Sequence, residues 1–206
     1  MNSEKIYQIA LTLVPKVGDV AAKKLIAYCG GAEAVFKESR KSLMMIPGIG
    51  SVMANSIVSQ DLLSAAEFEL RFMEQNEVKP VYFMDDDYPF RLKQCADGPI
   101  MLYRRGDVNL NAKRILSIVG TRKVTDYGKK TTEEIVEGLS GLEDVLVVSG
   151  LAYGVDVMAH KACLKYGVPT VGVLAHGLDR IYPSMHYQIS KEMEEILVVG
   201  DSIQMI

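Results

Sequence analysis

The 206-residue sequence has few cysteines, no long apolar run and no strong excess of either charge. Its cysteines, Cys29, Cys95 and Cys163, are odd in number and widely spaced, which suits neither a disulfide framework nor a metal site. The longest apolar runs, such as 145–148 and 171–175, are too short to cross a bilayer. The N-terminus also lacks the pattern of a signal peptide. We therefore expect a soluble, cytoplasmic protein with no membrane partner.

The charge balance gives no global signal for nucleic acid, because the formal net charge is −3. A local signal exists between residues 113 and 130, where the only acid is Asp126. This stretch is the best candidate in the sequence for a surface that contacts phosphates. Its six basic residues are Lys113, Arg114, Arg122, Lys123, Lys129 and Lys130.

Residues 1–75 show helical periodicity that two similar turns interrupt. Pro15 and Gly18 interrupt the first helical pattern, and the segment 46–50 (Ile-Pro-Gly-Ile-Gly) interrupts the second. Each half predicts a short helix, a tight turn and another helix, similar to a helix-hairpin-helix. Such turns free backbone N–H groups for a phosphate, but few Lys or Arg flank the second turn. We therefore favour a helical bundle with little DNA contact.

Residues 61–110 form a transition between two patterns. A helix is predicted to end near residue 75, followed by a short strand over 81–84. The acidic triplet in 85–89 lacks the spacing of a calcium loop, so an exposed, solvated loop is predicted there.

From residue 115 onward, apolar strands alternate with helices. Buried strands are predicted over 115–119, 145–148 and 169–174, a helix over 127–139, and another from about 156 to 167. This alternation predicts an α/β fold, a Rossmann-like and mostly parallel sheet with helices on both faces. The predicted domains are therefore a helical one over 1–75 and a Rossmann-like one over 76–206.

Each of the three strands ends in a loop of glycine and polar residues, at 120–122, 149–156 and 177–179. Because ligands of open α/β sheets bind outside the carboxyl ends of the strands, these loops are expected to converge on one site. The loop 149–156 leads into a helix N-terminus, whose free N–H groups and dipole favour an anion. The three loops together predict a ligand that carries phosphate.

These loops do not match the sequence motifs of several enzyme classes. The dinucleotide fingerprint Gly-x-Gly-x-x-Gly is absent, and 128–131 has the wrong order for an ATP-binding loop. Ser149, Asp156 and His160 lack the Gly-x-Ser-x-Gly frame of a nucleophile elbow. Asp156 is predicted as the helix N-cap, and His160 as a partly buried residue or a donor to phosphate. The residues therefore disfavour a nicotinamide or flavin enzyme and nucleophilic catalysis, and no cofactor is expected.

The segments Ser117–Arg122, Val148–Asp156 and Gly177–Pro183 together resemble the DNA-processing protein A (DprA/Smf) family. The resemblance implies a Rossmann-like domain after a small all-α domain similar to a sterile alpha motif. It implies a non-enzymatic binder of single-stranded DNA that protects incoming strands in natural transformation and helps to load a RecA-type recombinase. It also implies a homodimer, where the dimer surface is retained.

The resemblance implies specific roles for two residues. Arg122 matches the arginine that family members use on a DNA phosphate. Tyr153 stands where some relatives carry a lysine, and its ring could instead stack on a base. The full set of predicted DNA or phosphate contacts is Gly120, Thr121, Arg122, Lys123, Ser149, Gly150, Tyr153, Gly154, Asp156, His160, Gly177 and Asp179.

The sequence departs from the family after about residue 195. Residues 196–202 are Ile-Leu-Val-Val-Gly-Asp-Ser, and the last residue is 206. The family would continue with further strands, so the second half of its Rossmann-like domain is expected to be missing here. Two alternatives remain: a nucleotide-binding or nucleotide-hydrolysing enzyme on a Rossmann-like fold, and a pure interaction domain. The enzyme would need a Pro-Gly-Gly-x-Gly-Thr signature, which is absent.

Overall fold

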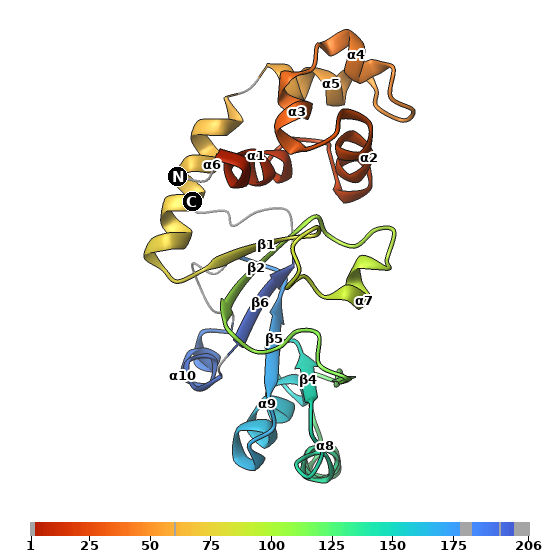
Figure 1. The fold of residues 1–206 in the computed structure, drawn as a ribbon. Coiled ribbons are helices and arrows are strands. Elements are labelled where there is room, and N and C mark those ends of the chain that lie inside the picture. The colour runs from red at the N-terminus through yellow and green to blue at the C-terminus, as the bar shows by residue number, and fades with distance from the viewer. Residues whose placement is uncertain (1–2, 60, 178–182, 194, 200–206) are drawn as a thin grey trace. The chain divides into compact units, whose positions relative to one another are not determined.

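The computed structural model describes residues 3–59, 61–177, 183–193 and 195–199. The chain divides into two compact units, Met1–Leu102 and Tyr103–Val199 (Figure 1). Each unit is built from its own part of the sequence and is described separately.

Helices make up the first part of unit one. The side chains of Ile9, Leu11, Leu25 and Leu43 are fully buried in its core, which explains the helical spacing of these apolar residues. The helices are α1 (Ser3–Thr12), α2 (Asp19–Cys29), α3 (Ala32–Lys37), α4 (Arg40–Met44), α5 (Ser51–Val58) and α6 (Leu62–Gln75).

The turn between α1 and α2 has the same backbone form as the turn between α4 and α5. Lys16 and Gly48 occupy equivalent places with φ of 68° and 87°. Gly18 and Gly50 then serve as N-caps without a side-chain hydrogen bond. Asp19 follows Gly18, and its carboxylate at the start of α2 disfavours a phosphate there.

The segment after α6 packs with the helices of unit one. It contains β1 (Lys79–Tyr82) and α7 (Phe90–Lys93), and β2 (Met101–Gly106) straddles the division between the units. The carboxylate of Asp19 accepts the N–H of Ile100 at 2.7 Å, which ties this segment to α2. The packing boundary therefore lies later than the predicted domain boundary at residue 75, and an independent domain over 1–75 stays a prediction.

Unit two is an α/β unit with a parallel sheet, as predicted. Its parallel strands are β3 (Arg114–Ser117), β4 (Val145–Ser149), β5 (Thr170–Leu174) and β6 (Glu195–Val199), which pair in that order. The helices are α8 (Asp126–Leu139), α9 (Val155–Tyr166) and α10 (Tyr187–Glu192), with a 3₁₀ turn at Ser184–His186.

The core of unit two lies between the sheet and the pair α8 and α9, which run side by side (Figure 1). Cys163 is fully buried there, and burial raises the pKa of its thiol to about 11. This supports its role as a core residue. The core residues are Val136, Val145, Val147, Ala162, Cys163 and Val168, with Ile118, Leu139 and Tyr166 packed against them.

A strand is present near 115–119 as predicted, but the prediction that it is buried was wrong. β3 spans Arg114–Ser117, with Ile115 and Leu116 only half-buried and Ser117 exposed. Among the described strands β3 pairs with β4 alone, so it is an edge strand of this sheet. An edge position leaves apolar side chains half open to solvent.

The acidic loop after β1 is more than a solvated turn. The carboxylate of Asp85 accepts the N–H of Tyr82 at 2.9 Å and pairs with Lys5 at 2.6 Å. Asp87 pairs with Lys79 at 2.8 Å. The loop therefore anchors α1 to the end of β1.

Replacing Asp85 by alanine is expected to lower the free energy of unfolding by about 1–2 kcal/mol, because the Tyr82 N–H and the half-buried Lys5 both lose a partner. Urea denaturation measures this change. Asp86→Ala is the matched control, because Asp86 is exposed, and it is expected to leave the stability unchanged. Equal losses in the two variants would contradict the anchoring role.

Candidate nucleic-acid interface

Residues of the first two predicted loops, together with the residues just before the third loop, line one cavity at the carboxyl ends of β4 and β5. The cavity has a volume of about 270 Å³. Leu178 and Asp179 of the third loop lie outside the described residues. The lining residues are Arg122, Gly150, Leu151, Ala152, Tyr153, Val173, Leu174, Ala175, His176 and Pro183.

Gly154 brings the first two loops into contact. Its φ is 82°, and a Cβ at this position would overlap the carbonyl oxygen of Thr121. The next N–H, from Val155, donates to that same carbonyl at 3.1 Å. Gly120 is equally constrained, since a Cβ there would lie 2.6 Å from the Val155 side chain. Only glycines allow the 120–122 loop to lie against the start of α9.

His160 fixes the second loop from inside the protein. The side chain is fully buried, with Nε2 donating to the carbonyl of Gly150 at 2.6 Å and Nδ1 lying 2.8 Å from the Thr170 hydroxyl. Burial lowers the pKa of His160 to about 4, so the ring is neutral at physiological pH. A phosphate cannot reach this imidazole, so the predicted role of His160 as a phosphate donor is corrected to that of a buried support for the loop.

Ser149 and Asp156 are also part of the interior. The Ser149 hydroxyl donates to the carbonyl of Ile118 at 2.6 Å, and only 3% of the residue is exposed. The N-cap of α9 is Gly154, not Asp156 as predicted, because the helix begins one residue before the carboxylate. Asp156 is 7% exposed. The prediction that the side chains of Ser149 and Asp156 contact phosphate is therefore corrected, because both residues are buried.

The exposed cations of the first loop are available to a ligand. Arg122 lines the cavity, and within the described part of the chain it has no ion pair. Lys123 is exposed beside it, and its N–H donates to the Thr121 hydroxyl at 3.1 Å, which shapes the turn. Arg122 therefore presents a guanidinium that can bind a phosphate through two parallel hydrogen bonds.

Tyr153 lines the same cavity with 42% of its surface exposed. Its ring packs edge-to-face with the ring of His186, with 5.1 Å between the ring centroids and 67° between the ring planes. His186 is buried and donates from Nδ1 to the carbonyl of Leu151 at 2.8 Å. The sequence carried no signal for His186, because it comes from a segment that follows the third loop.

The residue just before the third loop is a second histidine that was not predicted as part of the site, His176. Gly177 is buried, and its carbonyl lies 2.9 Å from Nδ1 of His176. His176 lines the cavity, and its Nε2 is buried with no hydrogen-bond partner among the residues that the structure describes. A ligand that donates a hydrogen bond would satisfy this nitrogen.

The chemistry of this edge favours anion binding over covalent catalysis. The Val155 N–H at the start of α9 already donates to Thr121, and the Asp156 carboxylate lies in the first turn, so the positive charge at this edge comes from the exposed Arg122 guanidinium. Ser149 and His160 bond to other groups, so the pair does not form a nucleophile and base. Across the described residues no cluster of metal-binding side chains occurs, and no described helix has the length and apolarity to span a membrane.

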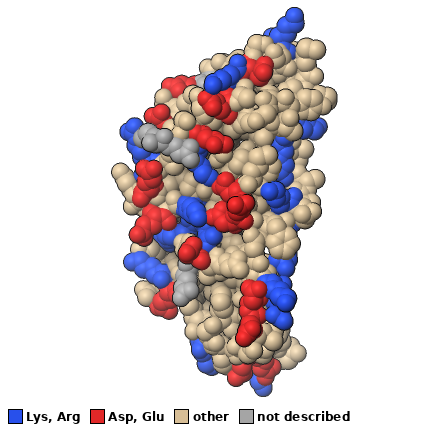
Figure 2. Space-filling model, in the orientation of Figure 1, with Lys and Arg blue, Asp and Glu red and all other residues tan. Residues whose placement is uncertain are grey.

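The surface charge is mixed rather than uniformly basic. Figure 2 shows acidic residues lying among Lys and Arg over the face in view. In the predicted basic stretch, Lys129 pairs with Asp126 at 2.8 Å and Lys130 with Glu134 at 3.7 Å. A contact with phosphates therefore depends on local cations, Arg122 above all, rather than on a broad field.

Comparison with protein families and curated proteins places the sequence among relatives. Residues 79–202 match the family described as DNA recombination-mediator protein A. The chain is 33% identical over 202 residues to Protein Smf of Synechocystis sp., a match that covers 93% of this chain and 49% of that relative. It is 40% identical over 107 residues to DNA processing protein DprA of Bacillus subtilis, covering 52% of this chain and 36% of that relative. The chain thus spans less than half the length of either relative.

The chain is also similar to solved structures. DNA processing protein A of Streptococcus pneumoniae gives a TM-score of 0.72 at 24% identity, over 99% of this chain and 70% of that one, which shows a shared fold. DNA processing protein A of Helicobacter pylori gives a TM-score of 0.51 at 26% identity, over 62% of this chain and 57% of that one. The latter structure concerns the single-stranded DNA binding mode of that protein.

The buried His160 predicts a pH-dependent stability. The folded protein keeps the ring neutral down to its pKa of about 4, whereas the unfolded chain protonates it near 6.5. The free energy of unfolding is expected to fall by up to about 3 kcal/mol as the pH decreases through this window, because only the unfolded chain gains the proton. Urea denaturation across the window measures the slope.

His160→Gln is expected to be less stable near neutral pH and to lose much of this slope. His176→Gln is the control and is expected to keep it, because His176 is only half-buried. An unchanged slope in the His160 variant would refute the assignment.

Proposed function

The chain belongs to the DNA recombination-mediator protein A family, and on that premise we propose that it binds single-stranded DNA at the cavity of unit two. The observation that carries the proposal is the position of Arg122 and Tyr153. Both line one cavity beside the start of α9. A cation and an aromatic ring at one place suit a chain of nucleotides.

The phosphate would bind to Arg122. The guanidinium supplies a positive charge and two parallel donors. Because this contact is to the backbone of the nucleic acid, the affinity should depend little on base sequence.

The base would bind to Tyr153 at the mouth of the cavity. A base of a single strand can leave its stack and lie on an aromatic ring, whereas a duplex keeps its bases paired and stacked. The cavity, of about 270 Å³, is lined largely by small or apolar residues and so leaves room for such a base. This favours a single strand as the ligand.

The wider role follows from the family alone. We propose that the protein acts in the processing of incoming DNA during natural transformation, without catalysis. A RecA-type recombinase and a second copy of the chain are its proposed protein partners. The Helicobacter pylori relative, whose structure describes single-stranded DNA binding, supports the DNA part of this proposal.

Replacing Arg122 by alanine is expected to weaken binding to a single-stranded oligonucleotide by about tenfold, because one phosphate contact is lost. The slope of log affinity against log salt should shrink by nearly one unit. Fluorescence anisotropy at several salt concentrations measures both quantities. Lys161→Ala, on the exposed side of α9, is the control and should bind normally. Unchanged affinity and slope would give Arg122 a different role.

A single strand is expected to bind more tightly than a duplex of equal length. The basic residues of unit two are too few and too mixed with acids to track two strands. Competition against a labelled single strand measures the preference. Displacement by duplex at an equal or lower concentration would contradict it. Stronger competition by a free nucleotide than by the single strand would favour the nucleotide-binding enzyme instead.

A further inference from the structure

The side chain of His176 gives the cavity of unit two a hydrogen-bond acceptor. His176 follows β5 at the carboxyl end of the sheet and lines the cavity. Its Nδ1 lies 2.9 Å from the carbonyl oxygen of Gly177, and because a carbonyl only accepts, Nδ1 carries the hydrogen. The Nε2 of the neutral ring is then an acceptor.

This acceptor is not used within the described parts of the chain. Nε2 of His176 is hidden from solvent and has no hydrogen-bond partner among the described residues. His160 differs, because both of its ring nitrogens have partners inside the protein, at Gly150 and Thr170. A buried acceptor without a partner is costly, since it has lost its bond to water and nothing replaces it. Such a group at the wall of a cavity points to a ligand that donates a hydrogen bond.

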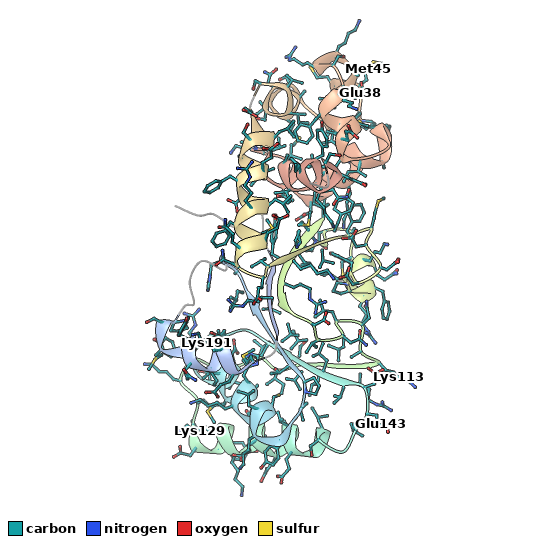
Figure 3. All side chains as sticks on the ribbon, turned by 60° about the vertical axis from the view of Figure 1, so that its left-hand side comes forward. Glu38, Met45, Lys113, Lys129, Glu143 and Lys191 are labelled. Carbon is teal, nitrogen blue, oxygen red and sulfur yellow. The ribbon has the colours of Figure 1, made fainter. Side chains whose placement is uncertain are left out.

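The acceptor lies with two groups that suit other parts of a nucleotide. Arg122 offers a cation for a phosphate, and Tyr153 offers a ring for the face of a base. Figure 3 labels Lys113 and Glu143, which come just before β3 and β4, so the cavity lies at the opposite end of these strands. His176 lines that same cavity and is placed to meet the edge of the base.

The size of the cavity suits one base. Its volume of about 270 Å³ lies below the roughly 300–1,000 Å³ of pockets that hold drug-sized ligands. Leu151, Val173 and Leu174 form part of its wall, and their apolar side chains suit the flat ring of a base. A dinucleotide would need more room.

We propose that His176 recognises the Watson–Crick edge of one unpaired base, by accepting a hydrogen bond from that edge at Nε2. This inference rests on the proposed function, the binding of single-stranded DNA at this cavity. Every DNA base carries an N–H on that edge, namely the amino groups of adenine and cytosine, N1–H of guanine and N3–H of thymine. One acceptor therefore fits all four bases, and the affinity stays nearly independent of sequence.

The contact selects a single strand over a duplex. In a duplex the N–H groups of the Watson–Crick edge donate to the opposite base, so none is available to His176. The preference for a single strand then comes from a neutral acceptor rather than from charge. This agrees with the mixture of acidic and basic residues on the surface (Figure 2).

Two homo-oligomers of equal length that differ in this N–H test the contact. One carries adenine at every position, and the other carries purine, the same ring system without the 6-amino group. We expect the full chain to bind the adenine strand about tenfold more tightly, because purine has no donor for Nε2. Fluorescence anisotropy measures both affinities on the unchanged protein.

Two variants separate the edge of the base from the phosphate. His176→Leu should bind the two strands equally, because it has no acceptor, and its affinity for adenine should fall to that for purine. Arg122→Ala is the matched comparison and should weaken both strands alike while keeping their ratio, because Arg122 meets the phosphate. Circular dichroism of each variant verifies folding.

The outcomes distinguish this inference from the proposed function. Equal binding of the two strands by the unchanged protein would overturn the role of His176 and leave the DNA site in place. A ratio that a folded His176→Leu variant leaves unchanged would do the same. Absence of binding to either strand would overturn the proposed function, and the role of His176 with it.

Discussion

The arrangement of unit two depends on the close approach between Gly154 and the carbonyl of Thr121. A side chain at residue 154 would overlap that oxygen, and the adjacent Val155 N–H donates to it. This contact holds the end of β3 against the start of α9. It therefore places Arg122 at the cavity, beside the start of the helix.

The polar side chains of the second loop support this arrangement from within. His160 holds the carbonyl of Gly150, and Ser149 holds the carbonyl of Ile118. Their hydrogen-bonding capacity is used inside the protein. Burial lowers the pKa of His160 and so keeps its ring neutral. The exposed groups that remain for a ligand are different ones, chiefly Arg122 and Tyr153. One set of residues therefore supports the loop from the interior, and a different set is exposed to a ligand.

The edge of the same sheet has a separate physical consequence. A parallel strand with a neighbour on one side only leaves half of its backbone groups pointing outward.

The sequence by itself determined the α/β alternation, the helices near 127–139 and 156–167, and the family, because these depend on local periodicity and on contiguous motifs. Position along the chain also predicted that loops at strand ends would meet. Only the tertiary structure decided which residues of those loops face a ligand. Ser149, Asp156 and His160 have polar side chains typical of a site, yet packing buries them. His186 reaches Tyr153 from a distant segment, and the exposure of β3 depends on which strands neighbour it. Burial and long-range contact arise from the whole fold, so no local pattern could encode them.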